Sequence, residues 1–172
     1  MPNQNLPEQT EYAPFFGRYI ERVTDQDLIS ALRSSREELR LKMRTFPEAK
    51  GTFRYAEGKW SVKELIQHIT DTERIMSYRA LCFARRDATA LPGFDEDEFA
   101  ANSHADQRTL ADLITEFETV RASTIMLFES FSDEMLKALG TASGKAMSAR
   151  AVGYMIAGHG LHHGQVLEER YR

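Results

Sequence analysis

The sequence is poor in cysteine and has no long apolar run. Cys82 is the single cysteine among 172 residues, so no disulfide can close within the chain. No apolar run approaches the roughly 20 residues that a transmembrane helix needs. Residues 1–10 are polar and contain proline, unlike a signal peptide. We therefore expect a soluble, cytoplasmic protein that makes no contact with a membrane.

The sequence also has no excess of basic over acidic residues. Lys and Arg number 22 and Asp and Glu number 26, which leaves a net charge of −4 with the two signs interspersed. Because binding to a phosphate backbone requires a basic surface, no nucleic acid partner is expected. The sequence also lacks the nucleotide-binding motif Gly-x-Gly-x-x-Gly and the P-loop.

The chain does contain long amphipathic segments with apolar residues at helical spacing. The first ends at Phe46-Pro47, where proline cannot continue a helix, and the second opens with a capping box in which Ser61 and Glu64 satisfy each other's amide groups. Long helices are predicted over residues 24–46, 61–86, 106–128 and 148–172, with a short helix at 132–139. Loops are expected at 51–60, 90–98 and 140–144, and no strand is predicted.

This pattern predicts an all-α four-helix bundle. We divide the chain into an N-terminal extension, residues 1–23, that packs on the bundle, and a bundle domain, residues 24–172.

The last segment carries two histidines one helical turn apart. Four residues at ~1.5 Å rise place His159 and His163 on one face, about 6 Å apart along the axis. Apolar residues on the same seam indicate that this face points into the bundle. Two buried imidazoles cannot both be protonated without repulsion and loss of hydration, whereas neutral imidazoles bound to a metal avoid both costs.

A third histidine, His68, lies on an inward-facing seam of the second long helix. It could complete a site with three histidines and one open position for water or substrate, the usual layout of a catalytic metal site. The ordinary alternative for each histidine is a hydrogen-bonded core residue. His162 is expected at a helix interface or in solvent, and His104, in a polar loop, is expected to have no role. Glu-x-x-His, His-Glu-x-x-His and Cys-x-x-Cys pairs are absent, which favours a mononuclear site.

Four segments, in this order and at this spacing, resemble the DinB/YfiT-like metalloenzymes: residues 59–73, 91–97, 120–121 and 158–165. The resemblance covers roughly residues 25–171. It implies an up-down-down-up four-helix bundle, usually a homodimer, that binds a divalent ion. The ion is zinc or nickel, in some members iron or manganese, and its ligands fall on His68, His159 and His163. Members with known activity include S-transferases that use low-molecular-weight thiols, such as bacillithiol-dependent enzymes, and mycothiol-dependent maleylpyruvate isomerase.

Two charged residues are candidates for the surroundings of the ion. Asp71 could orient a ligand imidazole by accepting its second ring N–H, and Arg121 could pair with a substrate carboxylate. Ordinary surface ion pairing is the alternative for both. Trp60 and Phe94 are expected to anchor the core or a loop and not to contact substrate.

Three functions remain open from the sequence. The first is an S-transferase in which the ion activates a small thiol that attacks an electrophilic carbon. The second is a hydrolase that uses metal-bound water, although no acidic residue next to the histidines is identifiable as its base. The third is a non-enzymatic helical module that the ion stabilises. A small-molecule substrate belongs to the first two.

Overall fold

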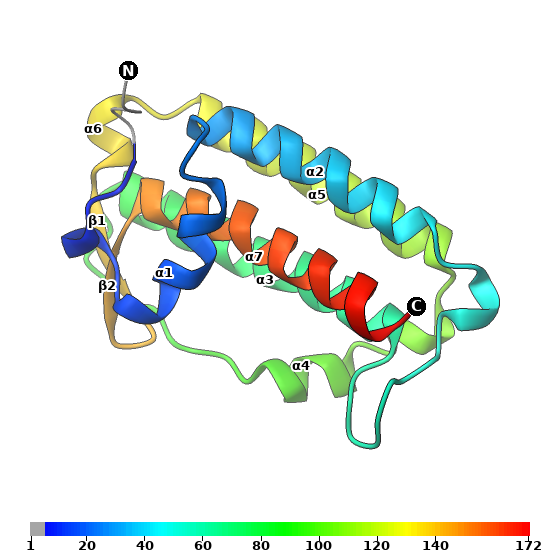
Figure 1. Ribbon diagram of the computed structural model, residues 1–172. Helices are drawn as coiled ribbons and strands as arrows, with labels where there is room; N and C mark the ends of the chain where they lie inside the picture. The colour runs from blue at the N-terminus through cyan, green and yellow to red at the C-terminus, as the bar shows by residue number, and fades with distance from the viewer. Residues whose placement is uncertain (1–5) are drawn as a thin grey trace.

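A computed structural model describes residues 6–172 and shows a bundle of four long helices (Figure 1). These are α2 (Leu28–Arg44), α3 (Val62–Ala84), α5 (Leu110–Glu129) and α7 (Ala149–Arg170). Helices α2 and α3 each pack on both α5 and α7, so they lie on opposite corners of the bundle. The expected all-α four-helix architecture is confirmed.

Helices α3 and α5 run in the same direction. Gln67, early in α3, contacts Arg108 just before α5, and Ser77, later in α3, contacts Thr124 late in α5. A crossover segment, residues 85–109, makes this parallel arrangement possible, as the up-down-down-up order requires. The crossover contains α4 (Glu96–Asn102) and the 3-10 turn η4 (Ala105–Gln107).

Side-chain caps set where the long helices begin. In α3 the predicted capping box is complete, because Glu64 N donates to Ser61 Oγ at 3.0 Å and Ser61 N donates to Glu64 Oε2 at 2.7 Å. The first long helix begins later than expected, at Leu28, because Asp27 caps it. For the same reason α5 begins after Thr109 and not at residue 106.

The segment that we expected to be a flexible loop at residues 140–144 forms a β-hairpin instead. Strands β1 (Leu139–Ala142) and β2 (Lys145–Ser148) pair antiparallel. Ser143 and Gly144 between them both have positive φ, 52° and 69°, which is the backbone of a tight two-residue hairpin turn. A Cβ on Gly140 would lie 1.8 Å from the Phe83 ring, so the hairpin can approach α3 only because that position is glycine.

Residues 6–23 lie against the bundle and contain a helix that was not predicted, α1 (Pro14–Ile20), between the 3-10 turns η1 (Gln9–Glu11) and η2 (Glu21–Val23). A Cβ on Gly158 would lie 1.9 Å from the Tyr19 carbonyl oxygen, so this segment touches the backbone of α7. The start of the predicted extension, residues 1–5, lies outside the described residues, and its boundary at residue 23 stays a prediction. The remaining short elements are η3 (Glu48–Lys50) and α6 (Asp133–Leu136).

A polar layer divides the core into two apolar halves. One half gathers the N-terminal part of α2 with the C-terminal parts of α3 and α5, and the other gathers the opposite ends. Between them, at the middle of each helix, lie buried polar residues: Ser35, Glu73, Arg121 and His159. Across residues 6–172, no helix combines the length and the apolar character that a membrane crossing needs.

Candidate metal centre

Three histidine side chains meet where α3 and α7 face each other. His159 Nε2 lies 3.2 Å from His68 Nε2 and 3.1 Å from His163 Nε2. One ligand atom from each of the three lies within 4.8 Å of those of the other two. His68 and His159 are buried, 5% and 7% exposed, and His163 is partly exposed. The structure therefore brings together the three residues that the sequence nominated.

The spacing of these nitrogens fits one shared ion better than hydrogen bonds. A neutral imidazole has one donor and one acceptor nitrogen, so His159 Nε2 cannot form a good hydrogen bond with both neighbours at once. Two nitrogens bound to a tetrahedral zinc ion at about 2.0–2.1 Å would lie roughly 3.3 Å apart. The observed separations are close to that value. Three imidazole nitrogens are also a donor set that suits zinc, nickel and iron.

The rings are held in the neutral form that a metal ligand requires. Burial lowers the pKa of His68 to about 4. Burial, together with the neighbouring His68, His162 and Arg18, lowers the pKa of His163 to about 2. Burial lowers the pKa of His159 well below its usual value, with the other two ligand rings adding to the effect. At neutral pH each ring can therefore offer a lone pair without first losing a proton.

Aromatic side chains hold two of the rings in place. The indole of Trp60 lies against His68 with ring centroids 4.5 Å apart, and the Tyr19 ring meets His159 edge-on at 5.3 Å. Tyr171 fixes the Trp60 segment by donating from its hydroxyl to the Trp60 carbonyl at 2.8 Å. Trp60 thus packs on a ring of the site while it anchors the loop that leads into α3.

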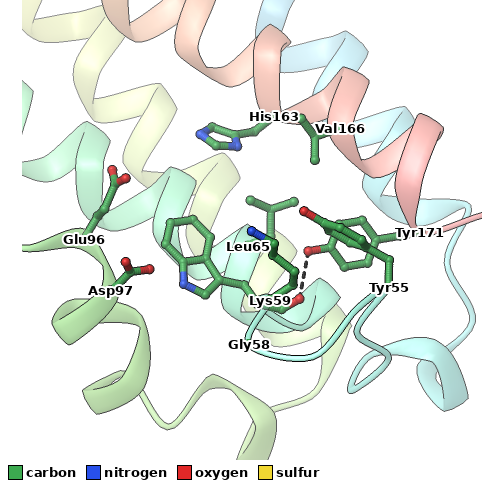
Figure 2. A pocket seen from close by; sticks show the side chains of 10 residues that line it. Tyr55, Gly58, Lys59, Leu65, Glu96, Asp97, His163, Val166 and Tyr171 are labelled. Carbon is green, nitrogen blue, oxygen red and sulfur yellow. Dashed lines mark hydrogen bonds between the residues drawn. The ribbon is translucent and has the colours of Figure 1, made fainter.

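Two cavities adjoin the histidines. The first cavity, of about 400 Å³, is walled by polar and aromatic side chains from the 51–61 loop, α4 and the end of α7 (Figure 2). The second cavity, of about 330 Å³, lies between α1, α3, α7 and the hairpin turn. His163 and Glu96 line both, so the two cavities meet at the candidate metal centre.

Sequence reasoning missed the carboxylates of α4. Figure 2 shows Glu96 and Asp97 on the side of the first cavity opposite Tyr55 and Tyr171. Partial burial at the rim and the charge of Asp97 raise the pKa of Glu96, while Arg18 acts in the opposite direction. Asp97 is the one charged group that raises the pKa of His68. The two residues lie 28 and 29 positions after His68 in the chain, and their one signal in the sequence was a place in segment 91–97, which carries part of the family resemblance.

The other residues singled out in the sequence lie around the site in different ways. Asp71 accepts a hydrogen bond from Gln67 at 2.8 Å and forms none with a ligand histidine among the described residues. His162 packs edge-on against Tyr19 and lines the second cavity, outside the group of three. His104 is exposed on the crossover and lines neither cavity. Phe94 packs against Phe99 with ring centroids 5.1 Å apart and also lines the second cavity.

Arg121 does not face either cavity. It is fully buried and donates to both oxygens of Glu73, from Nε at 2.7 Å and Nη2 at 2.9 Å. Nη1 donates to the Ser35 hydroxyl and to the Leu32 carbonyl. Its anionic partner is thus a residue of the chain, Glu73, in place of the substrate carboxylate that the sequence suggested.

Comparison with known proteins gives a family and several similar folds. A family model described as the DinB superfamily matches residues 31–167. No curated protein sequence matches the chain. YfiT from Bacillus subtilis, described as a probable metal-dependent hydrolase with an unusual four-helix bundle topology, superposes with a TM-score of 0.74 at 14% identity. The alignment covers 83% of this chain and 82% of YfiT.

Two further structures share the fold. A mycothiol-dependent maleylpyruvate isomerase superposes with a TM-score of 0.70 at 14% identity; 85% of this chain is covered, but only 61% of the isomerase. The DinB-like protein YjoA from Bacillus subtilis superposes with a TM-score of 0.59 at 20% identity, with 83% of this chain and 87% of YjoA covered. At these identities the likeness concerns the fold alone.

Proposed function

The chain belongs to the DinB superfamily, and from that premise we propose that it is a metal-dependent enzyme that transfers a small thiol to an electrophilic substrate. His68, His159 and His163 would hold the ion, with zinc or nickel favoured over iron and manganese. The observation that carries the proposal is the convergence of three neutral imidazole nitrogens, 3.1 and 3.2 Å apart, at the meeting point of two cavities. When bound, a divalent ion would supply an open Lewis-acidic position that lowers the pKa of a thiol or a water molecule.

The two cavities suit a reaction with two substrates. The first cavity is lined by Tyr55, Lys59, Tyr171 and other polar groups, which suits a polar low-molecular-weight thiol. The second cavity has more apolar walls and suits the electrophile. Because both are lined by His163 and Glu96, a thiol in one and a carbon centre in the other would approach each other beside the histidines.

Glu96 is the group that we assign to proton transfer. A raised pKa makes a carboxylate a better proton acceptor, and Glu96 lines both cavities. The proton would pass from the thiol to the Glu96 carboxylate. The sulfur would then form a bond to the substrate carbon as the bond to the leaving group breaks and its electron pair departs with that group.

Hydrolysis is the second candidate, and Glu96 is also the observation that favours it. A missing general base was the argument against a hydrolase from the sequence, and the structure supplies a carboxylate with the required tendency. Water would take the place of the thiol, and the first cavity would then bind part of the substrate. A purely structural ion is disfavoured, because cavities adjoin the histidines on two sides.

The thiol proposal is tested with cobalt as a spectroscopic substitute for the native ion. Addition of bacillithiol or glutathione to the cobalt-loaded protein should produce a sulfur-to-cobalt charge-transfer band, which serine-containing analogues of the thiols should not produce. If every thiol leaves the spectrum unchanged while a generic ester is hydrolysed, the hydrolase replaces the transferase.

A Glu96→Gln variant identifies the proton acceptor in either reaction. It should keep its metal, because Glu96 is not one of the converging ligands, but lose turnover by roughly 100-fold at neutral pH. Glu98→Gln, on the same helix and lining neither cavity, is the matched control. Equal turnover in the two variants would remove Glu96 from the mechanism.

The homodimer stays a prediction, which sedimentation of the purified chain would test.

A further inference from the structure

The second cavity contains a buried arginine without an acidic partner. Arg79 of α3 is 5% exposed and lines the cavity, yet it forms no ion pair with any acidic residue in the described part of the chain. Its Nη2 donates to the Pro92 carbonyl at 2.8 Å and to the Ser143 hydroxyl at 3.1 Å, and its Nη1 faces Met76 Sδ at 3.5 Å. All three acceptors are neutral.

An uncompensated buried charge is costly, and proteins normally match such a charge with a carboxylate or phosphate. Arg121, in the same bundle, shows the usual solution, with both oxygens of Glu73 in contact. Burial alone lowers the pKa of Arg79, with no acidic group opposing it. Arg18, which also lines the cavity, stacks on Phe15 and Tyr19 and likewise has no ion pair among residues 6–172. The cavity thus carries positive charge that the chain itself leaves unmatched at Arg79.

A second polar group in the same cavity also lacks a partner. Thr72 is 5% exposed, and its Oγ1 is buried without a hydrogen bond. Each of the other helical threonines of the structure donates to the carbonyl four residues earlier: Thr70, Thr115, Thr119 and Thr124. Thr72 gives up that bond and lines the second cavity, which leaves its hydroxyl available to a ligand.

The two groups lie on one face of α3 in line with His68. Thr72 is four residues after His68 and Arg79 seven residues after Thr72, and both steps are near whole numbers of helical turns. Helical side chains lean toward the N-terminus of their helix, and the contact of Arg79 with Met76 shows that its guanidinium does so. The guanidinium therefore extends back toward Thr72 and the metal centre.

The remaining wall is mixed: Arg18, Glu96, Ser143 and the histidines lie beside an apolar part formed by Phe15, Phe16, Met76, Phe94 and Met155. The cavity volume of about 330 Å³ suits a small organic molecule with an apolar body.

We propose that the second cavity binds the carboxylate of the substrate between the Arg79 guanidinium and the Thr72 hydroxyl, with an apolar body between this carboxylate and the histidines. This inference deepens the proposed function and rests on it for the position of the reacting end. One guanidinium edge and one hydroxyl match the two oxygens of a carboxylate, whereas a phosphonate would carry a third oxygen without a donor.

The test uses phenylacetate as the probe and the methyl signals of Met76 and Met155, both in the cavity wall, as the NMR readout. Phenylacetate should shift these signals in wild-type protein, both metal-loaded and metal-free, and neutral phenylacetamide should not. Arg79→Met should weaken phenylacetate binding roughly 10- to 100-fold, the effect expected when a charge-assisted hydrogen bond is lost. Arg85→Met, which removes the same charge from an exposed position at the end of α3, should not.

Thr72→Val provides a variant whose fold is not at risk. Because Thr72 Oγ1 has no partner in the chain, the substitution should leave the melting temperature unchanged or raise it. It should still weaken phenylacetate binding by roughly three- to tenfold, since one neutral hydrogen bond to the ligand is lost. A variant that becomes less stable and binds the probe normally would show a structural hydroxyl and overturn the proposal.

Three other results would overturn it. The first is that phenylacetamide binds as tightly as phenylacetate, and the second is that benzylphosphonate binds more tightly. The third is that phenylacetate binds only the metal-loaded protein, and binds wild type and Arg79→Met equally well, as a carboxylate that ligates the ion would. Failure of the proposed function looks different: a purified protein without metal affinity would still show the Arg79 and Thr72 effects on the probe.

Discussion

The middle of the bundle holds two buried polar groups of residues that differ in whether they are complete. Arg121 and Glu73 satisfy each other at 2.7 and 2.9 Å, with Ser35 and the Leu32 carbonyl taking the remaining donors. The three histidines instead place their Nε2 atoms 3.1 and 3.2 Å apart, and His159 Nε2, with a single lone pair or a single N–H, cannot form a good hydrogen bond in both contacts. The first group needs nothing from outside the chain, whereas the second has its lone pairs directed at a common point.

This difference separates a structural role from a functional one. Both groups are buried, polar and drawn from facing helices, so burial and residue type alone do not tell which of them is a binding site. Only the histidines adjoin the cavities. A buried polar group that the chain leaves unsatisfied is thus the stronger indication of a binding site, and the same reasoning carries the proposal for the second cavity.

The largest expected effect concerns metal content. His159→Ala and His163→Ala should each reduce the bound metal of purified protein from about one equivalent to nearly none, since two imidazoles hold an ion far less tightly than three. His104→Ala, on the exposed crossover, should keep its metal. Elemental analysis measures all three, and equal metal content would end the assignment of the centre.

Breaking the Arg121–Glu73 pair should have a large effect on the stability of the fold. Arg121→Met leaves the Glu73 carboxylate buried without its cation, and we expect the free energy of unfolding to fall by about 3–5 kcal/mol. The double variant Arg121→Met/Glu73→Met should recover much of that loss, as urea denaturation would show. The exposed pair Arg33–Glu129 is the control, at less than about 1 kcal/mol. If the double variant is no more stable than Arg121→Met, the ion pair contributes to stability beyond the mutual neutralisation of its two buried charges.

The third prediction concerns the stability of the metal-free protein in acid. Folded His68 takes up a proton only near pH 4, against about 6.5 when unfolded, so between these values the unfolded chain binds more protons. The free energy of unfolding should therefore fall as pH falls through this window, by about 3 kcal/mol from His68 alone. Urea titrations between pH 7.5 and 4 measure it. His68→Gln should flatten the curve and His104→Ala should not; an unchanged curve in His68→Gln would contradict the assigned cause.

The smallest effect is expected at Asp71. Its carboxylate faces Gln67 and Arg74, with no ligand histidine in hydrogen-bond contact, so Asp71→Asn should change metal affinity by less than about threefold. Competition with a metal-sensitive dye measures the affinity. A loss of tenfold or more would restore Asp71 as a residue that orients the site.

Local chemistry made part of the fold and site predictable. The capping box at Ser61 and Glu64 depends on neighbours within one turn, and the i, i+4 spacing of His159 and His163 fixes their common face once a helix forms. The hairpin at residues 139–148 was missed, because its turn relies on positive φ at Ser143, a residue that seldom adopts it. Its close approach to α3 depends on Phe83, more than fifty residues away.

By itself, the amino-acid sequence determined the helical class, the order of the long helices and the common face of His159 and His163, because helical period and capping act over a few residues. Tertiary structure alone decided what those side chains meet. It paired Arg121 with Glu73, brought Glu96 to the rim of the centre through the crossover, and left Arg79 without an acidic partner and the Thr72 hydroxyl without a hydrogen bond in the second cavity. Such pairings depend on how helices distant in sequence pack and rotate against one another, which no local pattern specifies.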